Sequence, residues 1–167
     1  MDSFEKFYNK ALHFLSFRPR SEKEVRNYFI KPRRTKSGFV KKNISEETMD
    51  KIITRLKKQR FINDKEFVKW WIEQRLKFRP RAWRIIKMEL ARKGISQEIS
   101  DPIIQSLEFR IQNDLELAKR LVQKRINRYK NLSKIEIYQK MGRFLASKGF
   151  DYGIIKKVLG LTVDSSK

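Results

Sequence analysis

The 167-residue sequence contains no cysteine and only one histidine, His13. Without thiols the chain can form neither disulfides nor a cysteine nucleophile, which is typical of proteins from a reducing cytosol. A single histidine also argues against metal sites built from Cys and His ligands and against a Ser-His-Asp triad. The six glycines are spread singly, so no Gly-rich phosphate-binding loop is present. We expect no catalytic residue, no metal and no cofactor, and therefore no enzyme. Scattered carboxylates leave a metal-dependent nuclease open, although no pattern favours one.

Long apolar runs are missing as well. The most apolar stretch, residues 67–72, is interrupted by Lys69, and nothing approaches the length of a membrane span. The sequence begins Met-Asp-Ser-Phe-Glu, with acids where a signal peptide would carry basic residues. These features predict a cytoplasmic protein without a membrane partner.

Positive charge is abundant. Lys and Arg number 41 against 19 Asp and Glu, which gives a formal charge of +22 and a pI near 10.4. Such an excess repels itself in a compact fold and usually indicates a polyanionic partner. Because 40% of the residues are apolar and 12% aromatic, the chain can nevertheless form a real core and is not a disordered basic tail.

The sequence repeats itself. Phe-Arg-Pro-Arg at residues 17–20 recurs at residues 78–81, an offset of 61 (78 − 17). Lys-Gly followed by an apolar residue occurs at 93–95 and again at 148–150, an offset of 55 (148 − 93). Apolar residues at helical spacing surround each copy. The pattern therefore indicates that one small helical unit is repeated along the chain, as in stacked arrays.

Helix signals divide the chain into three such units. Ser21 with Glu24 and Ser133 with Glu136 form capping boxes that begin the middle helices of the first and third units. Pro102 lies inside an apolar pattern, and we expect the helix there to start near Ser100 so that the proline falls in its first turn. The predicted fold is all-α, with tandem three-helix units in an elongated, curved array. Their predicted bounds are residues 1–62, 63–110 and 111–161, followed by a disordered tail over 162–167.

The first unit departs from this plan where the others have a tight Lys-Gly turn. Its residues 31–42 hold six basic side chains and no acid. We predict a mobile cationic loop, which counterion release would favour as a phosphate contact.

The motifs in this order resemble the RecX family of bacterial recombination regulators. The resemblance rests on residues 11–25, on Arg60–Asp64 with the apolar positions that follow, and on the two Lys-Gly turns. It runs from about residue 7 to residue 159. It implies tandem three-helix repeats, in agreement with the pattern above. Asn63 departs from the pair of aspartates usual at this point.

The resemblance also implies a function. Members of the family bind the RecA recombinase filament, lie in its groove and usually inhibit ATPase, strand-exchange and coprotease activities, so they act in DNA repair and the SOS response. We therefore expect a monomeric regulator whose partners are the RecA filament and single- and double-stranded DNA.

Basic residues at turns and exposed positions are the candidate binding residues. Any one of them alone has a plain interpretation as a solvated surface charge, whereas duplication of the arginine turns favours phosphate or carboxylate recognition. The candidates are Arg18, Arg20, Lys31, Arg33, Arg34, Lys36, Lys41, Lys42, Arg79, Arg81, Arg84, Lys87, Arg125 and Arg128. Trp70, Trp71 and Trp83 could stack on unpaired bases, but their helical spacing favours a place in the core.

An alternative function is stand-alone binding to DNA or RNA in the manner of helix-turn-helix proteins, which also use three-helix units. Residues 100–107, within the third predicted helix of the second unit, include Asp101 and no Lys or Arg, which makes a poor recognition helix. Salt dependence separates the two functions, because binding to naked DNA weakens steeply as salt rises.

Overall fold

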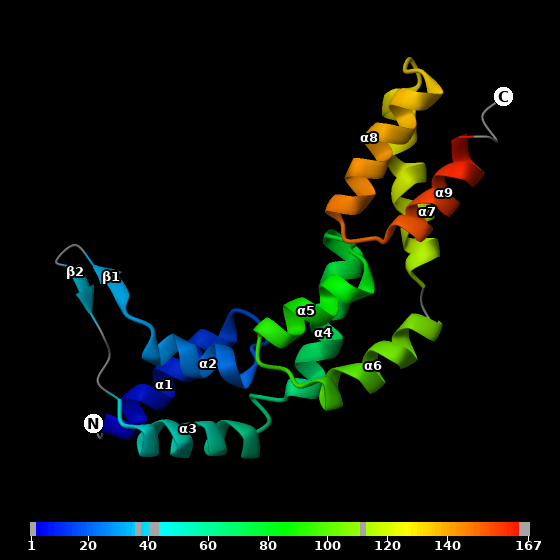
Figure 1. Ribbon diagram of the computed structural model, residues 1–167. Coiled ribbons are helices and arrows are strands. Elements are labelled where there is room, and N and C mark those ends of the chain that lie inside the picture. The colour runs from blue at the N-terminus through cyan, green and yellow to red at the C-terminus, as the bar shows by residue number, and fades with distance from the viewer. Residues whose placement is uncertain (1–2, 36–37, 41–43, 111–112, 164–167) are drawn as a thin grey trace. The chain divides into compact units, whose positions relative to one another are not determined.

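The computed structural model describes residues 3–35, 38–40, 44–110 and 113–163. In this part of the chain nine α-helices follow one another as three tandem three-helix repeats, so the predicted all-α class is confirmed (Figure 1). The first repeat comprises α1 (Ser3–Ser16), α2 (Glu22–Ile30) and α3 (Glu46–Lys58); the second α4 (Asp64–Phe78), α5 (Trp83–Arg92) and α6 (Gln97–Arg110); the third α7 (Asp114–Ile126), α8 (Lys134–Ser147) and α9 (Tyr152–Val163). A short 3₁₀ turn, Asn127–Tyr129, follows α7.

The basic segment predicted as a loop contains a hairpin instead. Strands β1 (Arg33–Thr35) and β2 (Gly38–Val40) pair antiparallel, with Arg33 opposite Val40 and Thr35 opposite Gly38. Gly38 has φ +114°, a conformation that glycine adopts without strain, and this lets the chain turn back. The predicted loop therefore contains strands at residues 33–35 and 38–40, while Lys36, Lys41 and Lys42 lie outside the described residues.

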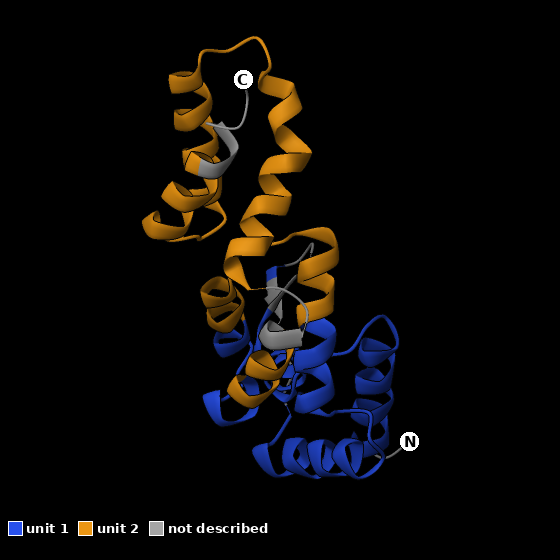
Figure 2. Ribbon diagram, turned by 90° about the vertical axis from the view of Figure 1, so that its right-hand side faces the viewer, with its two compact units in different colours: residues 1–71, 90–100 blue, residues 72–89, 101–167 orange. Residues whose placement is uncertain are grey.

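The chain divides into two compact units (Figure 2). Unit 1 comprises residues 1–71 and 90–100, and unit 2 comprises residues 72–89 and 101–167. The first repeat therefore belongs wholly to unit 1 and the third wholly to unit 2, while the second repeat contributes residues to both.

Side-chain caps begin several of the helices, as the sequence predicts. Ser21 and Ser133 each accept a hydrogen bond from the backbone N–H three residues later, and Glu24 and Glu136 complete the two predicted capping boxes. Asn113 caps α7 in the simpler way, accepting from the N–H of Glu116. Each cap satisfies backbone donors that have no partner inside the helix.

Helix α6 begins earlier than expected. It starts at Gln97 rather than near Ser100, so Pro102 lies inside the helix and not in its first turn. Pro102 removes one backbone hydrogen bond to the carbonyl of Glu98. Both side chains are exposed, so this part of the helix faces solvent and the helix continues past the proline.

Each unit has its own apolar core. In unit 1, α1, α2 and α3 bury their predicted stripes against one another, and the cluster consists of Tyr8, Ala11, Val25, Phe29, Met49, Ile52, Ile53, Leu56 and Ile62. In unit 2 the third repeat buries Leu117, Ala118, Val122, Met141, Leu145, Phe150, Ile155, Val158 and Leu159. At roughly 1.5–3 kcal/mol for each large apolar side chain, this burial is the main stabilising contribution in both units.

The last helix ends later than predicted. Helix α9 runs to Val163, so residues 162 and 163, which we expected in the tail, are helical. Among the described residues, no helix is long and apolar enough to cross a membrane.

We expect Gly149→Ala to destabilise unit 2 by about 2 kcal/mol or more, because an L-residue is strained at φ > 0. Gly149 has φ +91°, and a Cβ there would overlap the side chain of Ile85. Chemical denaturation measures the effect. The matched control is Gly160→Ala, where a Cβ meets no atom within 4 Å; there the helix should become more stable. Equal unfolding free energies for the two variants would contradict the assignment of a tight turn at Gly149.

Candidate interaction surface at the arginine turns

The two Phe-Arg-Pro-Arg segments, residues 17–20 and 78–81, form the turns that precede α2 and α5. We call them the arginine turns. In the first, the Arg18 guanidinium donates two hydrogen bonds to Glu24, of 2.8 Å to Oε1 and 3.1 Å to Oε2. Arg18 also lies over the ring of Trp70, 5.6 Å from its centroid. The fork geometry of the guanidinium fixes the carboxylate as well as neutralising it.

Glu24 is the most connected carboxylate of this turn. It accepts from Arg18, from the ammonium of Lys93 and from the backbone N–H of Ser21. Burial by itself would raise the pKa of Glu24, but the hydrogen bonds from Arg18 and Lys93 outweigh burial and lower the pKa below its ordinary value. Glu24 is therefore held ionised and joins the first repeat to the Lys-Gly turn of the second.

Arg20 has a different environment. Its guanidinium carbon lies 4.0 Å from the centroid of the Phe14 ring, and its Nε is buried without a hydrogen-bond partner. Burial, followed by repulsion from Arg18, lowers the pKa of Arg20, although Glu24 opposes this. The side chain remains cationic because arginine pKa values lie so high.

The second arginine turn places its arginines near Glu89. Arg75 donates to Glu89 over 2.5 Å, and a nitrogen of Arg81 lies 3.8 Å from the other oxygen of the same carboxylate. The Nε of Arg81 is buried without a partner, as the Nε of Arg20 is in the first turn. Arg79 is exposed and forms no ion pair with any carboxylate in the described parts of the chain. The two turns thus share a buried arginine Nε close to a glutamate, but they differ at the other arginine, because Arg18 pairs with Glu24 whereas Arg79 is exposed.

Each arginine turn docks on the Lys-Gly turn of the next repeat. In unit 1 the hydroxyl of Ser21 donates to the carbonyl of Lys93 over 2.7 Å. In unit 2 the backbone N–H of Ala82 donates to the carbonyl of Lys148 over 3.0 Å. Ser21 and Ala82 are 61 residues apart (82 − 21), the same offset as the arginine turns, so the two contacts are equivalent. We call these contacts the first and second joints.

Glycine is required in the Lys-Gly turns for two reasons. Gly94 has φ +84° and Gly149 has φ +91°, both in the region that other residues rarely adopt. The neighbouring repeat also lies directly on them, because a Cβ at Gly94 would come within 2.6 Å of Lys23. Arg84 donates from Nε to the carbonyl of Gly149 and closes the second joint.

Aspartates at the starts of α4 and α7 add a second contact to each joint. Asp64 accepts from the backbone N–H of Glu22 over 3.1 Å, and Asp114 accepts from the backbone N–H of Trp83 over 2.9 Å. Each aspartate thus caps the middle helix of the preceding repeat. Burial raises the pKa of Asp64, and the hydrogen bond from Glu22 only partly offsets this.

The sequence interpretation did not assign this role to either aspartate. The helix that follows each aspartate is capped by the asparagine just before it. Asn63 accepts from the N–H of Glu66, as Asn113 does from that of Glu116. The repeated Asn-Asp pair at 63–64 and 113–114 was the available signal. Asn63, which stands where an aspartate is usual, therefore serves as the cap of α4.

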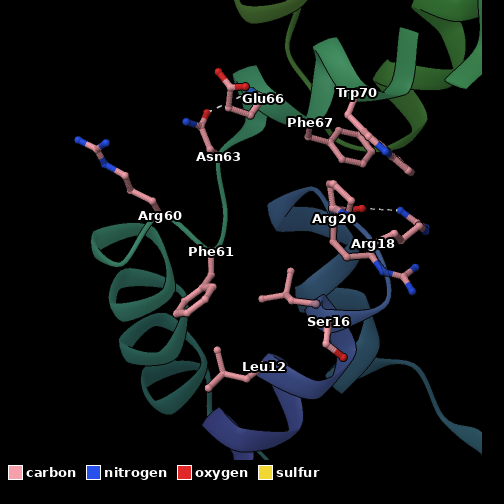
Figure 3. Close-up of a pocket in the computed structure, with 12 residues that line it drawn as sticks. Leu12, Ser16, Arg18, Arg20, Arg60, Phe61, Asn63, Glu66, Phe67 and Trp70 are labelled. Carbon is pink, nitrogen blue, oxygen red and sulfur yellow. Dashed lines mark hydrogen bonds between the residues drawn. The ribbon is translucent and has the colours of Figure 1, made fainter. Parts of the chain in front are cut away.

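A cleft of about 930 Å³ lies beside the first arginine turn, within unit 1 (Figure 3). Leu12 and Phe61 face it from one side, and Phe67 and Trp70 from α4 on the other. Arg18, Arg20 and Arg60 contribute positive charge, against the single acid Glu66, which itself pairs with Lys69. The cleft is thus an apolar hollow with a basic border.

The remaining predicted binding residues that the structure describes have different surroundings. Lys87 pairs with Asp101 over 3.1 Å, and Arg125 lies over Phe144 at 4.3 Å with its Nε buried. Arg128 and Lys31 are exposed. Arg33 and Arg34 are placed only by their backbone in β1. Arg84 contributes to the second joint, as described above.

The tryptophans are mainly structural. Trp83 is 3% exposed, as the core interpretation predicts. Trp70 and Trp71 are half-buried, because neighbouring helical residues cannot both point into one core. Each of these two rings has a cation over it: Arg18 over Trp70, and Lys93 over Trp71 at 4.8 Å. Cation–π contacts therefore reinforce the first joint.

Together these features define a class: a protein of tandem three-helix repeats, joined through charged turns and carrying a large excess of basic side chains. Comparison with known proteins identifies the family. Profiles for the first, second and third three-helix domains of RecX match residues 8–30, 63–101 and 112–159 in that order. The chain belongs to the RecX family.

Individual relatives agree. The chain is 30% identical over 159 residues to the regulatory protein RecX of Oceanobacillus iheyensis, covering 95% of this chain and 54% of that protein. The chain is also 33% identical over 168 residues to the regulatory protein RecX of Bacillus pumilus, and the match covers 99% of this chain and 59% of that protein. The chain thus spans little more than half the length of these curated relatives.

Solved structures share the fold. The crystal structure of RecX from Lactobacillus salivarius superposes with a TM-score of 0.72 at 28% identity, covering 97% of both chains. A second crystal structure, of regulatory protein RecX, superposes with a TM-score of 0.70 at 24% identity. The match covers 94% of this chain and 73% of that one. The second likeness supports the fold alone.

We expect Glu24→Gln to destabilise unit 1 by about 1–3 kcal/mol at pH 7, because it leaves two partly buried cations without their carboxylate. A lowered pKa means that the ion pairs stabilise the fold above the unfolded-state pKa of about 4.3 and are lost as pH falls through the folded-state pKa. The difference between wild type and variant should therefore be constant above about pH 5 and shrink below pH 4.

Denaturant titrations at several pH values measure this difference. The control is Glu47→Gln, which removes a fully exposed pair with Lys51 and should leave stability unchanged. A Glu24 variant as stable as the Glu47 variant at pH 7 would contradict a joint built on Glu24.

Proposed function

We propose that this protein regulates homologous recombination by binding the RecA–DNA filament and inhibiting its ATPase, strand-exchange and coprotease activities. It would act in the cytoplasm as a monomer, within DNA repair and the SOS response. The observation that carries the proposal is the pair of equivalent arginine turns in a RecX-family chain of formal charge +22. Repeated cationic sites suit a partner that is itself a repeating polyanion.

The mechanism we propose is occupancy. Each repeat would place its basic turn on neighbouring recombinase protomers or on the bound DNA, and weak contacts would add through effective concentration. The groove of the RecA–DNA filament would then be closed to duplex DNA and to substrate proteins. The proposed contacts are made by the arginine-turn residues Arg18, Arg20, Arg79 and Arg81, by the cations Arg84, Lys87, Arg125 and Arg128 of the second and third repeats, and by the basic segment with Lys31, Arg33, Arg34, Lys36, Lys41 and Lys42.

The charge of α6 speaks against the alternative of a stand-alone DNA- or RNA-binding protein. This helix, third in its repeat, carries Glu98, Asp101 and Glu108 against one cation, Arg110. A recognition helix that enters a nucleic-acid groove needs the opposite balance. The basic surface of the protein therefore suits an assembly in which protein contacts accompany phosphate contacts.

We expect the protein to inhibit ATP turnover by a preformed RecA–single-stranded DNA filament at well below one molecule per recombinase protomer. The measurement is a titration at moderate salt with a lysine-rich peptide of matched charge as control. Binding to the filament should persist at salt concentrations where binding to naked DNA is lost, because naked-DNA affinity falls with a log–log slope of about −0.9 per phosphate contact. Inhibition that the peptide reproduces would favour the stand-alone nucleic-acid binder.

We expect the double variant Arg79→Ala/Arg128→Ala to weaken filament binding by roughly 10-fold, because exposed arginines without internal ion pairs are available to the partner. The variant should fold normally, since neither side chain is buried. The charge-matched control is Lys6→Ala/Lys65→Ala, which removes two exposed lysines outside the arginine turns. An equal loss in both double variants would mean that net charge, and not the position of the arginines, determines binding.

A further inference from the structure

Each arginine turn begins with an exposed phenylalanine. Phe17 is 69% exposed and Phe78 is 65% exposed, whereas the apolar side chains of the helices around them are largely buried. A single exposed apolar residue is ordinary on a protein surface and needs no explanation. Two at the same point of two repeats, each next to an arginine, are a pattern.

The pattern extends to the third repeat in the sequence. Phe17 and Phe78 stand four residues before Ser21 and Ala82, and Tyr129 stands four residues before Ser133. An aromatic residue therefore precedes the middle helix of every repeat. Each is followed directly by a cation, since Lys130 follows Tyr129 as Arg18 and Arg79 follow the phenylalanines. Tyr129 is half-buried, so the first two repeats present the ring most openly.

The exposed rings are held by rigid turns. Pro19 and Pro80 restrict the backbone two residues after each phenylalanine. The joints fix the same turns from the other side, through the hydrogen bonds from Ser21 to Lys93 and from Ala82 to Lys148. A side chain presented in a fixed geometry loses little entropy on binding, which is the property of an anchor residue.

The surroundings of the rings favour a protein partner over stacked bases. The ammonium of Lys77 lies over one face of the Phe78 ring, 5.3 Å from its centroid. The ring of His13 lies edge-on to Phe17, with centroids 5.0 Å apart. What remains free is a phenyl group suited to insertion into a hollow. The cations beside it, Arg79 above all, suit a carboxylate at the rim of that hollow.

We propose that Phe17 and Phe78 are equivalent anchors, each of which inserts into an apolar, acid-rimmed pocket on a protein subunit, and that neighbouring subunits of a polymer present this pocket in turn. The inference rests on the proposed function, in which the polymer is the recombinase filament. The phenylalanines then supply contacts to protein, and the exposed Arg79 beside Phe78 supplies an electrostatic part of the same contact.

The test uses Phe17→Ala, Phe78→Ala and the double variant in the whole 167-residue chain. Affinity for the preformed RecA–single-stranded DNA filament is measured at moderate salt, together with affinity for naked single-stranded DNA and the unfolding midpoint. Chain-matched controls are Ile135→Ala and Tyr152→Ala, because Ile135 is 71% exposed and Tyr152 is 73% exposed and neither belongs to the repeated aromatic position.

We expect each single phenylalanine variant to lose roughly 10-fold in filament affinity and the double variant roughly 100-fold, as two anchors on one chain act together. Unfolding midpoints and naked-DNA affinity should stay unchanged, and the controls should bind as wild type does. Phenylalanine variants that bind the filament like the controls would overturn the anchors while leaving the proposed function intact. Equal losses on naked DNA would overturn them in favour of base stacking. A wild-type protein that fails to bind the filament would remove both proposals.

Discussion

The structure depends on one kind of contact, the docking of the middle helices α2 and α5 on the turn of the following repeat. Helices α2 and α5 have 9 and 10 residues, and helices this short are marginal in water by themselves. Their first backbone N–H groups have no partner within the helix. Asp64 and Asp114 supply that partner from the next repeat. Helices α2 and α5 are therefore each completed by the repeat that follows, so neighbouring repeats stabilise one another.

The contacts within the chain also affect the distribution of charge, because they use part of its acidic residues. Several of the 19 acids are used inside the chain: Glu24 holds Arg18 and Lys93, and Glu89 holds Arg75 near Arg81. Cations outnumber acids by more than two to one, 41 against 19. Glu24, Asp64 and Asp114 lie at the contacts between repeats, and the large excess of cations suits a polyanionic partner.

The sequence predicted the helices well because their apolar spacing and capping residues are local signals. Ser21 and Ser133 begin helices as expected, and Gly94 and Gly149 lie in the predicted turns. The predictions that were wrong concern features that the periodicity of apolar residues does not reveal. Pro102 was given too much weight as a helix start, and the hairpin of β1 and β2 depends on strand pairing that has no helical pattern.

The site was harder to predict than the fold. The arginine turns were visible as a repeated motif, but the contact that ties the first of them to the next repeat was not, because Lys93 is distant in sequence from Glu24. A residue such as Asp64 shows its role only when the helix it caps, α2, is placed beside it. The exposure of Phe17 and Phe78 could not be predicted either, because both continue apolar patterns that otherwise mark the core.

The two joints hold equivalent helices by different chemistry. At the first joint Ser21 donates through its side chain, Glu24 binds two cations, and the side chain of Lys23 lies on Gly94. At the second joint Ala82 donates through its backbone and Ile85 lies on Gly149. Ion pairs are sensitive to pH and salt, whereas backbone hydrogen bonds and apolar contacts are far less so.

Unit 1 and unit 2 therefore differ in how the medium affects them, although both follow one plan. Acid protonates Glu24 and removes its two ion pairs from the joint next to Phe17, whereas Ile85, at the matching position of the second joint, has no charge to lose. A partner that binds through both turns would then keep its contact at the second when conditions weaken the first.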